Sequence, residues 1–350
     1  MSKAVRLSDI AARVGVSTVT VSKALSGQKG MSSEVRTRIL ATAQEMGYVK
    51  GEARRSSVEK RTGFRIGLLV AERYLGKYVT FYAHLQQLVA AEIAAKDCVM
   101  LLEGISLEKE TATVVPDIIG DGLCDGVIVI GKVAAPYLKM LEQLGAPTVY
   151  LDFTEPAHDA DAVISDSFYG SYMLANYLYS LGHEHIGFVG TLLATSSITD
   201  RYLGYLRAVM EHGQEVREDW ILRDRDRVTG ELDPEQYFVL PDEMPSAFVC
   251  NCDLAAAMLI RKLRERGYSV PHDISVVGYD NYLYPGFCDI GITTWDVDTR
   301  EMARRAVHNL LHKLRGENYR RGVVVVSGRL IEKESSSSIQ KAIQPINLLN

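Results

Sequence analysis

Cationic and hydroxyl side chains are concentrated at the N-terminal end of this 350-residue chain. The first 60 residues hold 11 Lys and Arg against 5 Asp and Glu, a net charge of +6, whereas the remaining 290 residues carry −11. Serines and threonines lie among these cations, between Ser17 and Ser22. Because guanidinium, ammonium and hydroxyl groups are the donors that bind phosphate oxygens, this distribution favours contact of one end of the chain with a polyanion.

Motifs that assemble a catalytic centre are absent from the sequence. It contains no G-x-S-x-G, no Walker loop, no G-x-G-x-x-G after a strand and no H-E-x-x-H. The cysteines form no C-x-x-C and no Cys/His pair at zinc spacing, so we interpret them as reduced packing residues. They are Cys98, Cys124, Cys250, Cys252 and Cys288. We therefore expect neither an enzyme nor a bound metal or cofactor.

The hydrophobic residues are spread through the chain in short runs. No run reaches the length of about 18 apolar residues that a membrane-spanning helix needs. The first ten residues, MSKAVRLSDI, also lack the apolar stretch of a secretory signal. The sequence therefore predicts a cytoplasmic protein.

Helical periodicity predicts three short helices in the first fifty residues, over 6–14, 17–25 and 32–46. Gly15 supplies a tight turn between the first two, and Ser17 can cap the second. We therefore predict an all-α helix-turn-helix domain over residues 1–49. Residues 50–63 are dense in charge and serine, which indicates a linker, or a helix that forms only on a partner.

From Phe64 onward, short apolar runs alternate with amphipathic helical stretches, which is typical of a parallel sheet covered by helices. A single open sheet of this size would be unusually large, so we predict an α/β module of two doubly wound lobes with a cleft between them. The same periodicity predicts one helix over Glu108–Gly120 and a charged surface excursion around Arg217–Gln236. The tail over 335–350 starts in a serine run and meets Pro345, which disfavours a coiled coil.

The segment LSDIAARVGVSTVTVSKALSG, residues 7–27, resembles the N-terminal headpiece of the LacI/GalR family of bacterial transcription regulators. The resemblance is carried by Ala11-Ala12, Gly15-Val16-Ser17, Thr20-Val21-Ser22 and Lys23-Ala24-Leu25. It implies that the second helix enters the major groove of operator DNA. By the family's pattern Thr18, Val19 and Lys23 face bases, whereas Ser17, Thr20 and Ser22 lie nearer the DNA backbone. A three-helix protein-binding module is the alternative for this domain.

The linker departs from that family. Members usually carry, after Tyr48, a proline and asparagine, then an alanine-arginine pair and a leucine that enters the minor groove. Ser57 stands at the leucine position here, so the apolar insertion that kinks the operator is not expected. Arg54 and Arg55 can still bind phosphates or a narrow minor groove, and a flexible basic linker is the alternative.

The remainder, from Ile66 to about Ile331, resembles the periplasmic-binding-protein-like type I effector module of the same family. The matching landmarks are Asp125–Ile128, Asp166–Gly170, Gly182–Gly190, Arg201–Tyr205, Asp273–Asn281 and Ile292–Trp295. The resemblance implies an effector-binding and dimerisation module over 64–334. Lobe one is expected over about 64–165 and 295–322, and lobe two over about 166–294 and 323–334.

A sugar hydroxyl both donates and accepts hydrogen bonds, so a site that selects a sugar needs fixed donors, carboxylate acceptors and aromatic faces. Arg201 and Asp280 correspond to effector contacts in the family, and a buried charge at a strand end needs a partner or ligand. By the same resemblance the effector-binding residues include Tyr74, Phe81, Tyr82, Asp253 and Trp295. Structural roles remain open for some residues of this region. Phe81 or Tyr82 can belong to the hydrophobic core, and Asp166 is favoured as a helix N-cap over a ligand contact.

The sequence therefore predicts a homodimeric DNA-binding regulator, a repressor, whose operator affinity a small carbohydrate controls. Its partners are double-stranded operator DNA and that effector. A purine-type corepressor is the alternative effector. A solute-binding protein without a transcriptional role is disfavoured, because it has no use for residues 1–60.

Overall fold

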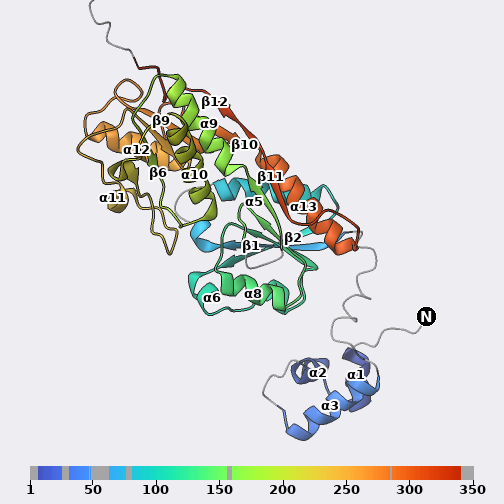
Figure 1. Ribbon diagram of the computed structural model, residues 1–350. Helices are drawn as coiled ribbons and strands as arrows, with labels where there is room; N and C mark the ends of the chain where they lie inside the picture. The colour runs from blue at the N-terminus through green and yellow to red at the C-terminus, as the bar shows by residue number, and fades with distance from the viewer. Residues whose placement is uncertain are drawn as a thin grey trace, which may run out of the picture. The chain divides into compact units, whose positions relative to one another are not determined.

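The computed structural model describes residues 7–25, 31–46, 48, 63–75, 81–155, 160–283 and 286–339. It divides into two compact units, Met1–Phe64 and Arg65–Asn350 (Figure 1). Each unit has its own secondary structure and its own core.

The first unit contains three helices, α1 (Leu7–Val14), α2 (Thr18–Leu25) and α3 (Ser33–Glu45). Gly15 adopts the predicted tight turn between α1 and α2, with a φ of +75° that only glycine tolerates easily. Helices this short are unstable alone, so packing must hold them. Ile10, Val21 and Ile39, one from each helix, are fully buried against one another.

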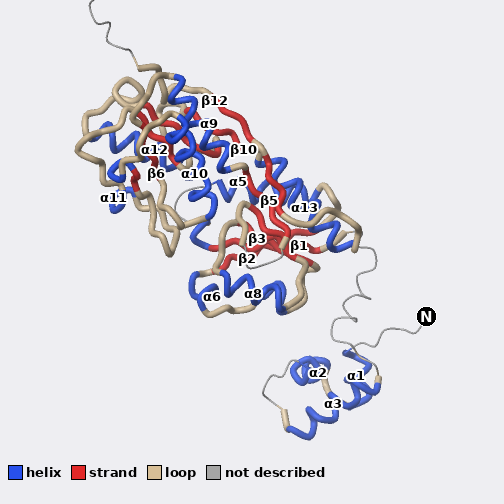
Figure 2. Tube along the Cα trace, viewed as in Figure 1, coloured by secondary structure: helices blue, strands red, loops and turns tan. Residues whose placement is uncertain are grey.

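The second unit contains two six-stranded sheets (Figure 2). The first has the order β11-β5-β4-β3-β1-β2, and all of its strand pairs are parallel. Its strands are β1 (Arg65–Ala71), β2 (Val99–Ile105), β3 (Gly126–Ile130), β4 (Thr148–Leu151), β5 (Asp161–Ser165) and β11 (Val323–Val326). The predicted doubly wound lobe is present.

The second sheet has the order β12-β10-β9-β8-β6-β7, and its strands pair in parallel except for the antiparallel pair of β10 and β12. Its strands are β6 (Ile186–Val189), β7 (Ile221–Leu222), β8 (Ala247–Cys250), β9 (Ser275–Asp280), β10 (Thr293–Val297) and β12 (Gly328–Ile331). Both α/β lobes of the predicted fold class are therefore formed.

Helices cover both sheets. In the first lobe these are α5 (Phe81–Ala94), α6 (Leu107–Thr111), α7 (Asp117–Gly120), α8 (Ala135–Gln143) and α13 (Thr299–Arg315), with the 3-10 turn η1 (Glu72–Tyr74). In the second they are α9 (Ser167–Ser180), α10 (Ser196–Glu211), α11 (Pro234–Tyr237) and α12 (Asp253–Glu265), with the turn η2 (Glu218–Trp220). Helices α5 and α13 pack together over the first sheet, and α6 and α8 lie on its other side (Figure 1).

The C-terminal strands are divided between the two lobes differently from the prediction. Strand β10 belongs wholly to the second sheet, whereas β11 pairs with β5 in the first sheet, although 323–334 was expected in lobe two. Ser327 alone separates β11 from β12, so the chain changes sheets within one residue. The four valines of β11 do not indicate in the sequence which of the two sheets the strand joins. Pairing with the open edge of the first sheet at β5 decides this.

The predicted helix over Glu108–Gly120 is wrong, because two short helices, α6 and α7, occupy this segment. Thr113 between them has a φ of +50°, and Pro116 is the N-cap of α7. The ring of a proline disfavours helical geometry in the residue before it, which interrupts the helix despite the apolar periodicity.

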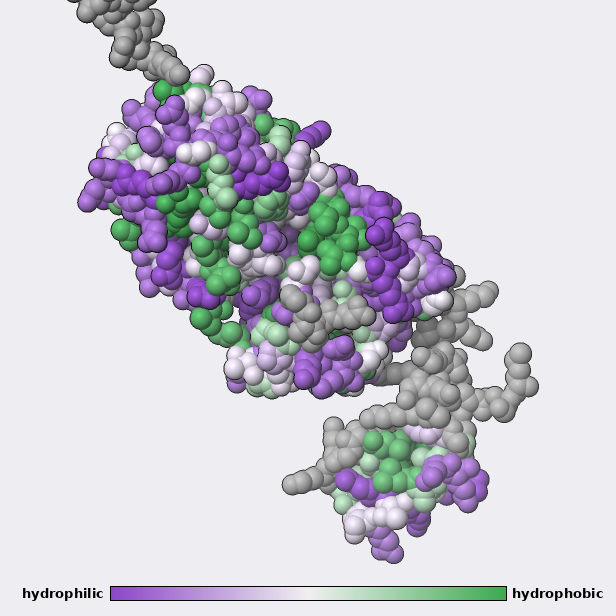
Figure 3. Space-filling model, viewed as in Figure 1, coloured by the Kyte–Doolittle hydropathy of each residue, from purple (hydrophilic) through white to green (hydrophobic). Residues whose placement is uncertain are grey.

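The surface of the second unit mixes hydrophilic and hydrophobic residues. Figure 3 shows a hydrophobic area over the region of β11, where Val323 and Val325 are about half exposed. Among the described residues, no helix combines the length and apolar character needed to cross a bilayer.

Candidate functional site

The turn before α2 is fixed by a side-chain cap. The backbone N–H of Thr20 donates to Oγ of Ser17 over 3.1 Å, and the two hydroxyl oxygens lie 2.8 Å apart. This bond satisfies one of the free N–H groups at the start of α2. Ser17 and Thr20, both predicted near the DNA backbone, therefore have a local structural role as well.

Helix α2 buries Val21 and Ala24, and this fixes its orientation in the first unit. At 3.6 residues per turn, positions 19 and 23 fall on the side of α2 opposite these two residues. Thr18, Val19, Ser22 and Lys23 belong to α2, but the positions of their side chains lie outside the described part of the structure. Arg54 and Arg55 also lie outside the described residues.

Helix α1 is tied to α3 at its C-terminal end. Arg38 donates from Nη2 to the carbonyl oxygen of Val14 over 2.8 Å, which satisfies an orphan carbonyl of α1. The Arg13–Glu45 ion pair, at 3.7 Å, is well exposed and contributes little stability. Packing and capping thus hold α2 in place for any contact that it makes.

In the second unit, polar and aromatic residues gather where the carboxyl ends of strands from both lobes face each other. We call this set the interlobe cluster: Tyr74, Tyr82, Asp152, Arg201, Arg225, Asn251, Tyr279 and Asp280. Three of its members end a strand or follow one directly: Asp152 follows β4, Asn251 follows β8 and Asp280 ends β9. Ligands of open α/β sheets bind at this edge.

Lobe one contributes two tyrosines and a carboxylate. The hydroxyl of Tyr82 donates to Oδ2 of Asp152 over 2.9 Å, and the hydroxyl of Tyr74 donates to the carbonyl of Lys132 over 3.0 Å. The two rings are 4.5 Å apart, and the ring of Phe81 meets Tyr82 edge-on at 5.6 Å. Burial raises the pKa of Asp152, and the charge of Arg201 opposes that rise.

Arg201 is the central cation of lobe two. It is only 8% exposed, its Nη1 donates to the carbonyl of Asn251 over 2.5 Å, and its guanidinium lies 3.7 Å from the centroid of the Tyr279 ring. Its buried Nε has no hydrogen-bond partner among the described residues. Because an unsatisfied buried donor costs free energy, a ligand atom at this position would be stabilising.

Asp280 ends β9 with a φ of +98°, a strained value for a residue with a side chain. Its Oδ1 accepts from the backbone N–H of Tyr282 over 3.0 Å. Burial raises the pKa of Asp280 to about 7, although the nearby Arg201 lowers it. Asp152 in lobe one also has a positive φ, of 67°. Strained backbone at both carboxylates is consistent with a functional constraint.

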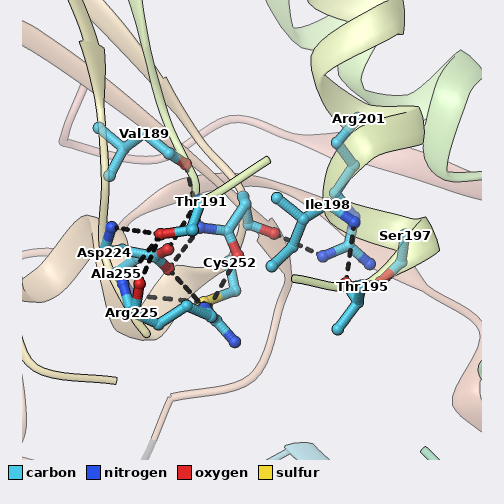
Figure 4. Close-up of polar contacts among 11 residues, drawn as sticks. Val189, Thr191, Thr195, Ser197, Ile198, Arg201, Asp224, Arg225, Cys252 and Ala255 are labelled. Atoms are coloured by element: carbon cyan, nitrogen blue, oxygen red, sulfur yellow. Dashed lines mark hydrogen bonds and ion pairs between the residues drawn. The ribbon is translucent and has the colours of Figure 1, made fainter. Parts of the chain in front are cut away.

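A second arginine, Arg225, follows β7 and is held by a buried carboxylate (Figure 4). Its Nε and Nη2 donate to Oδ2 of Asp224 over 3.0 and 2.7 Å, and Nη2 also donates to Oδ1 of Asn251 over 3.1 Å. Asp224 is fully buried and also accepts from the backbone N–H of Thr191. The expected surface excursion around Arg217–Gln236 is therefore wrong at this point, because ion pairing buries its charges.

Interactions across the two lobes show that the cluster forms one site. The charge of Arg201 in lobe two lowers the pKa of Tyr82 in lobe one, against the larger effect of burial, which raises it. Arg225 acts on the pKa of Tyr74 in the same direction. The hydroxyl of Tyr279 donates to Oγ of Ser165, at the end of β5, over 3.4 Å.

Two further predicted effector residues make structural contacts. Oδ1 of Asp253 accepts from the hydroxyl of Thr294 over 2.6 Å, and a Cβ at Gly278 would lie 2.0 Å from this oxygen. Asp253 thus ties α12 to β9 and β10. The ring of Trp295 packs against the backbone of Gly170 on α9.

Asp166 is the N-cap of α9, as predicted, because its Oδ1 accepts from the backbone N–H of Tyr169 over 3.2 Å. The five cysteines are free thiols, as predicted. Among the described residues no group of three or more His, Cys, Asp or Glu could hold a metal ion.

Sequence reasoning missed Asp152, Arg225, Asn251 and Tyr279. A signal existed for Asp152, because it follows the predicted strand Thr148–Leu151 just as Asp280 ends its own strand. No local pattern marks Arg225, which stands among four other charged residues between Arg223 and Arg227. Only the pairing with Asp224 and Asn251 reveals its position.

Two family models match the chain. The model of bacterial regulatory proteins of the lacI family matches residues 6–50, and that of the periplasmic-binding-protein-like domain matches residues 175–336. Together they cover more than half of the chain.

The chain is also similar to individual proteins. It is 28% identical over 338 residues to the HTH-type transcriptional repressor PurR of Pectobacterium atrosepticum, covering 94% of this chain and 96% of that protein. A structure of the transcriptional regulator CelR in complex with cellobiose superposes with a TM-score of 0.65 at 22% identity, covering 95% and 100% of the two chains. The lac repressor dimer bound to operator and the anti-inducer ONPF gives 0.65 at 19% identity, covering 96% and 100%.

Proposed function

This chain belongs to the lacI family of bacterial regulatory proteins and is a DNA-binding transcriptional regulator, and from that premise we propose that a small carbohydrate bound at the interlobe cluster controls its affinity for operator DNA. The observation that carries this proposal is the buried Arg201, whose Nε lacks a partner among the described residues and which lies near carboxylates of both lobes.

The polar groups of the cluster fit a polyhydroxylated ligand. Arg201 offers donors in a fixed fork, whereas Asp152 and Asp280 offer acceptors from opposite lobes. Each sugar hydroxyl donates one hydrogen bond and accepts others, so it can bridge such groups. Tyr74 and Tyr82 supply aromatic surface for the C–H face of a sugar ring. The structurally similar CelR holds cellobiose, which supports the same class of ligand.

A purine-type effector is the second candidate, and the similarity to PurR repressors favours it. A nucleobase is best recognised by an amide group that matches its edge and an aromatic face. The amide of Asn251 is already engaged, because its Nδ2 donates to Val189 and Asp224 while its Oδ1 accepts from Arg225. This occupancy supports the carbohydrate over the nucleobase.

For the DNA half, we propose that α2 reads the operator, with Thr18, Val19 and Lys23 at the bases and Ser17, Thr20 and Ser22 nearer the DNA backbone. Arg54 and Arg55 would add contacts to phosphates or the minor groove. One three-helix domain makes too few base contacts for specificity against genomic competitors. We therefore propose a homodimer that acts as a repressor on a near-palindromic operator, with the effector module supplying the dimer contacts.

A thermal-shift screen of sugars and nucleobases tests the effector. At least one sugar should raise the melting temperature, because a ligand that binds only the folded state stabilises it. Arg201→Ala should abolish this rise, whereas Arg207→Ala, on the exposed face of the same helix, should retain it. If a nucleobase alone raises the melting temperature, the carbohydrate assignment is wrong and the purine-type effector takes its place.

A further inference from the structure

We propose that a hairpin of lobe two is a strap that closes one side of the interlobe cluster and lifts off lobe one when the lobes separate. The strap consists of residues 226–231, and its tip rests on Arg73 of lobe one. The inference goes beyond the proposed function, since it concerns how the cluster is opened and not what binds there. An effector that reaches the cluster from this side has to pass the strap.

The strap is held in shape by its own hydrogen bonds. Arg225 and Leu232 form an antiparallel bridge at its base. At the turn, Oδ1 of Asp226 accepts from the backbone N–H groups of Val228 and Thr229 over 2.8 and 2.7 Å, as aspartate side chains do in tight turns. Because these bonds lie within the hairpin, the strap keeps its shape whether or not it touches lobe one.

The base of the strap is anchored in lobe two. The guanidinium of Arg225 is held by Asp224 and Asn251 (Figure 4), and Oγ1 of Thr191 donates to the carbonyl of Arg225 over 2.9 Å. Leu232, at the other end of the hairpin, packs against the core of lobe two. The strap therefore moves with lobe two, and its base is part of the interlobe cluster.

The tip of the strap meets a fixed side chain of lobe one. A Cβ at Gly230 would lie 3.8 Å from Cδ and 4.0 Å from Nε of Arg73, so the two residues are in contact across the lobes. The guanidinium of Arg73 donates to the carboxylate of Glu110 and to the carbonyl of Lys132, and it lies 5.0 Å from the centroid of the Tyr74 ring. The strap thus ends directly beside a member of the interlobe cluster.

The contact between strap and lobe one is easily released. In the described part of the chain, the hydrogen bonds of Arg73 go to Glu110 and Lys132, which belong to lobe one, and none goes to the strap. Val228, beside the tip, is 90% exposed, so no apolar core holds the strap down. A contact of a few atoms contributes little, whereas the base of the strap is fixed by several hydrogen bonds. Separation of the lobes on this side therefore breaks the contact at the tip first.

The test measures how often the interlobe cluster opens in the ligand-free full chain. Cys252 is half-buried at the base of the strap, with its Sγ 3.9 Å from Nη2 of Arg225, so its thiol reacts with N-ethylmaleimide faster when the lobes separate. Cys124, which lies against Gly67 in lobe one, is the internal reference. Mass spectrometry of the labelled peptides gives the rate for each thiol.

The decisive variants add a charge at the tip. Gly230→Asp places a carboxylate beside Arg73, whereas Gly230→Asn has the same shape without the charge, and both residues tolerate the φ of +72° at this position. We expect Cys252 to be labelled about 2- to 5-fold more slowly in Gly230→Asp than in Gly230→Asn, as an exposed ion pair predicts. This difference should shrink in about 1 M sodium chloride. Gly230→Lys places a like charge beside Arg73 and should be labelled faster than Gly230→Asn.

Gly213 provides the matched control. It has a φ of +66°, and a Cβ there would have no atom within 4 Å. The same three substitutions at Gly213 bring the same backbone strain and the same charges, but they should leave the labelling of Cys252 alike. The melting temperature shows that each variant is folded.

Each outcome decides for or against the strap. Equal labelling of Cys252 in the three Gly230 variants overturns it. A change of the same size at Cys124 also overturns it, because separation of the lobes is then not the cause. If Cys252 reacts only after unfolding in urea, the strap does not lift. Since no ligand is present, these results are independent of the effector, and a thermal-shift screen without a responding sugar would overturn the carbohydrate proposal alone.

Discussion

The backbone conformation and the pKa of Asp280 both reflect the buried environment of the site. Its carboxyl is held at a strand end with a strained backbone, and burial raises its pKa to about 7. A carboxyl whose pKa is higher in the folded than in the unfolded state favours folding at low pH. That contribution is complete below the unfolded pKa of about 3.8 and is lost as the pH rises through about 7.

Replacement of Asp280 by asparagine should therefore change the pH dependence of stability. Relative to the wild type, Asp280→Asn should become progressively more stable between about pH 4 and pH 7, because the amide does not ionise. Urea unfolding of the ligand-free protein at several pH values measures this difference. Asp166→Asn, at the N-cap of α9, is the control, because asparagine also caps helices well. A difference that stays constant over this pH range would contradict the assigned environment of Asp280.

At the scale of elements, the contact between α9 and α10 positions Arg201. Gly204, three residues further along α10, lies directly against the backbone of α9, since a Cβ there would be 2.0 Å from the carbonyl oxygen of Phe168. This close approach is possible only for glycine, and it sets the distance between the two helices. The orientation of Arg201 towards Asn251 and Tyr279 depends on that packing.

Gly204→Ala should force the two helices apart. We expect a loss of about 1–3 kcal/mol in the free energy of unfolding, as overpacking usually costs, together with weaker effector binding. Denaturant unfolding and the ligand-induced shift in melting temperature measure the two effects. Leu203→Ala, at a neighbouring exposed position, should change stability by about 0.5 kcal/mol or less. If Gly204→Ala is as stable as Leu203→Ala, α9 and α10 are not in close contact.

At the scale of the whole molecule, charge is divided between a basic N-terminal unit and an acidic effector unit. Electrostatic contact with DNA phosphates releases counter-ions, so its strength falls steeply with salt. Contacts to bases add sequence preference to this general attraction. The two effects can be separated by changing salt and by changing single side chains.

Operator binding by the full chain should therefore weaken steeply between 50 and 200 mM salt, by a factor of 1000 or more if about six phosphates are contacted. Lys23→Ala should bring affinity for the operator closer to that for random DNA, because it removes a predicted base contact. Fluorescence anisotropy with both duplexes measures this ratio. Arg13→Ala, an exposed cation of α1, should weaken both duplexes alike and leave the ratio unchanged. A salt-insensitive complex would contradict DNA binding through the basic unit.

Local patterns in the sequence determine the elements and the division of the chain. The cap at Ser17, the turn at Gly15 and the apolar periodicity predict the three N-terminal helices, because these are interactions between near neighbours. The same holds for most strands, whose apolar runs are continuous. The failure at Thr113 and Pro116 is also local, because a proline outweighs periodicity there. Arg201 and Asp280 could be predicted as site residues from the family motifs around them.

The tertiary structure alone decided the membership of β11 in the first sheet, the inward position of Asp253 and the place of Arg225 in the site. Each of these depends on a partner far away in the sequence. Val323 pairs with Ala162, Asp253 bonds Thr294, and Arg225 bonds Asn251. Hydrogen bonds and ion pairs act over a few ångströms in space, so the fold must bring such partners together before their roles can be seen.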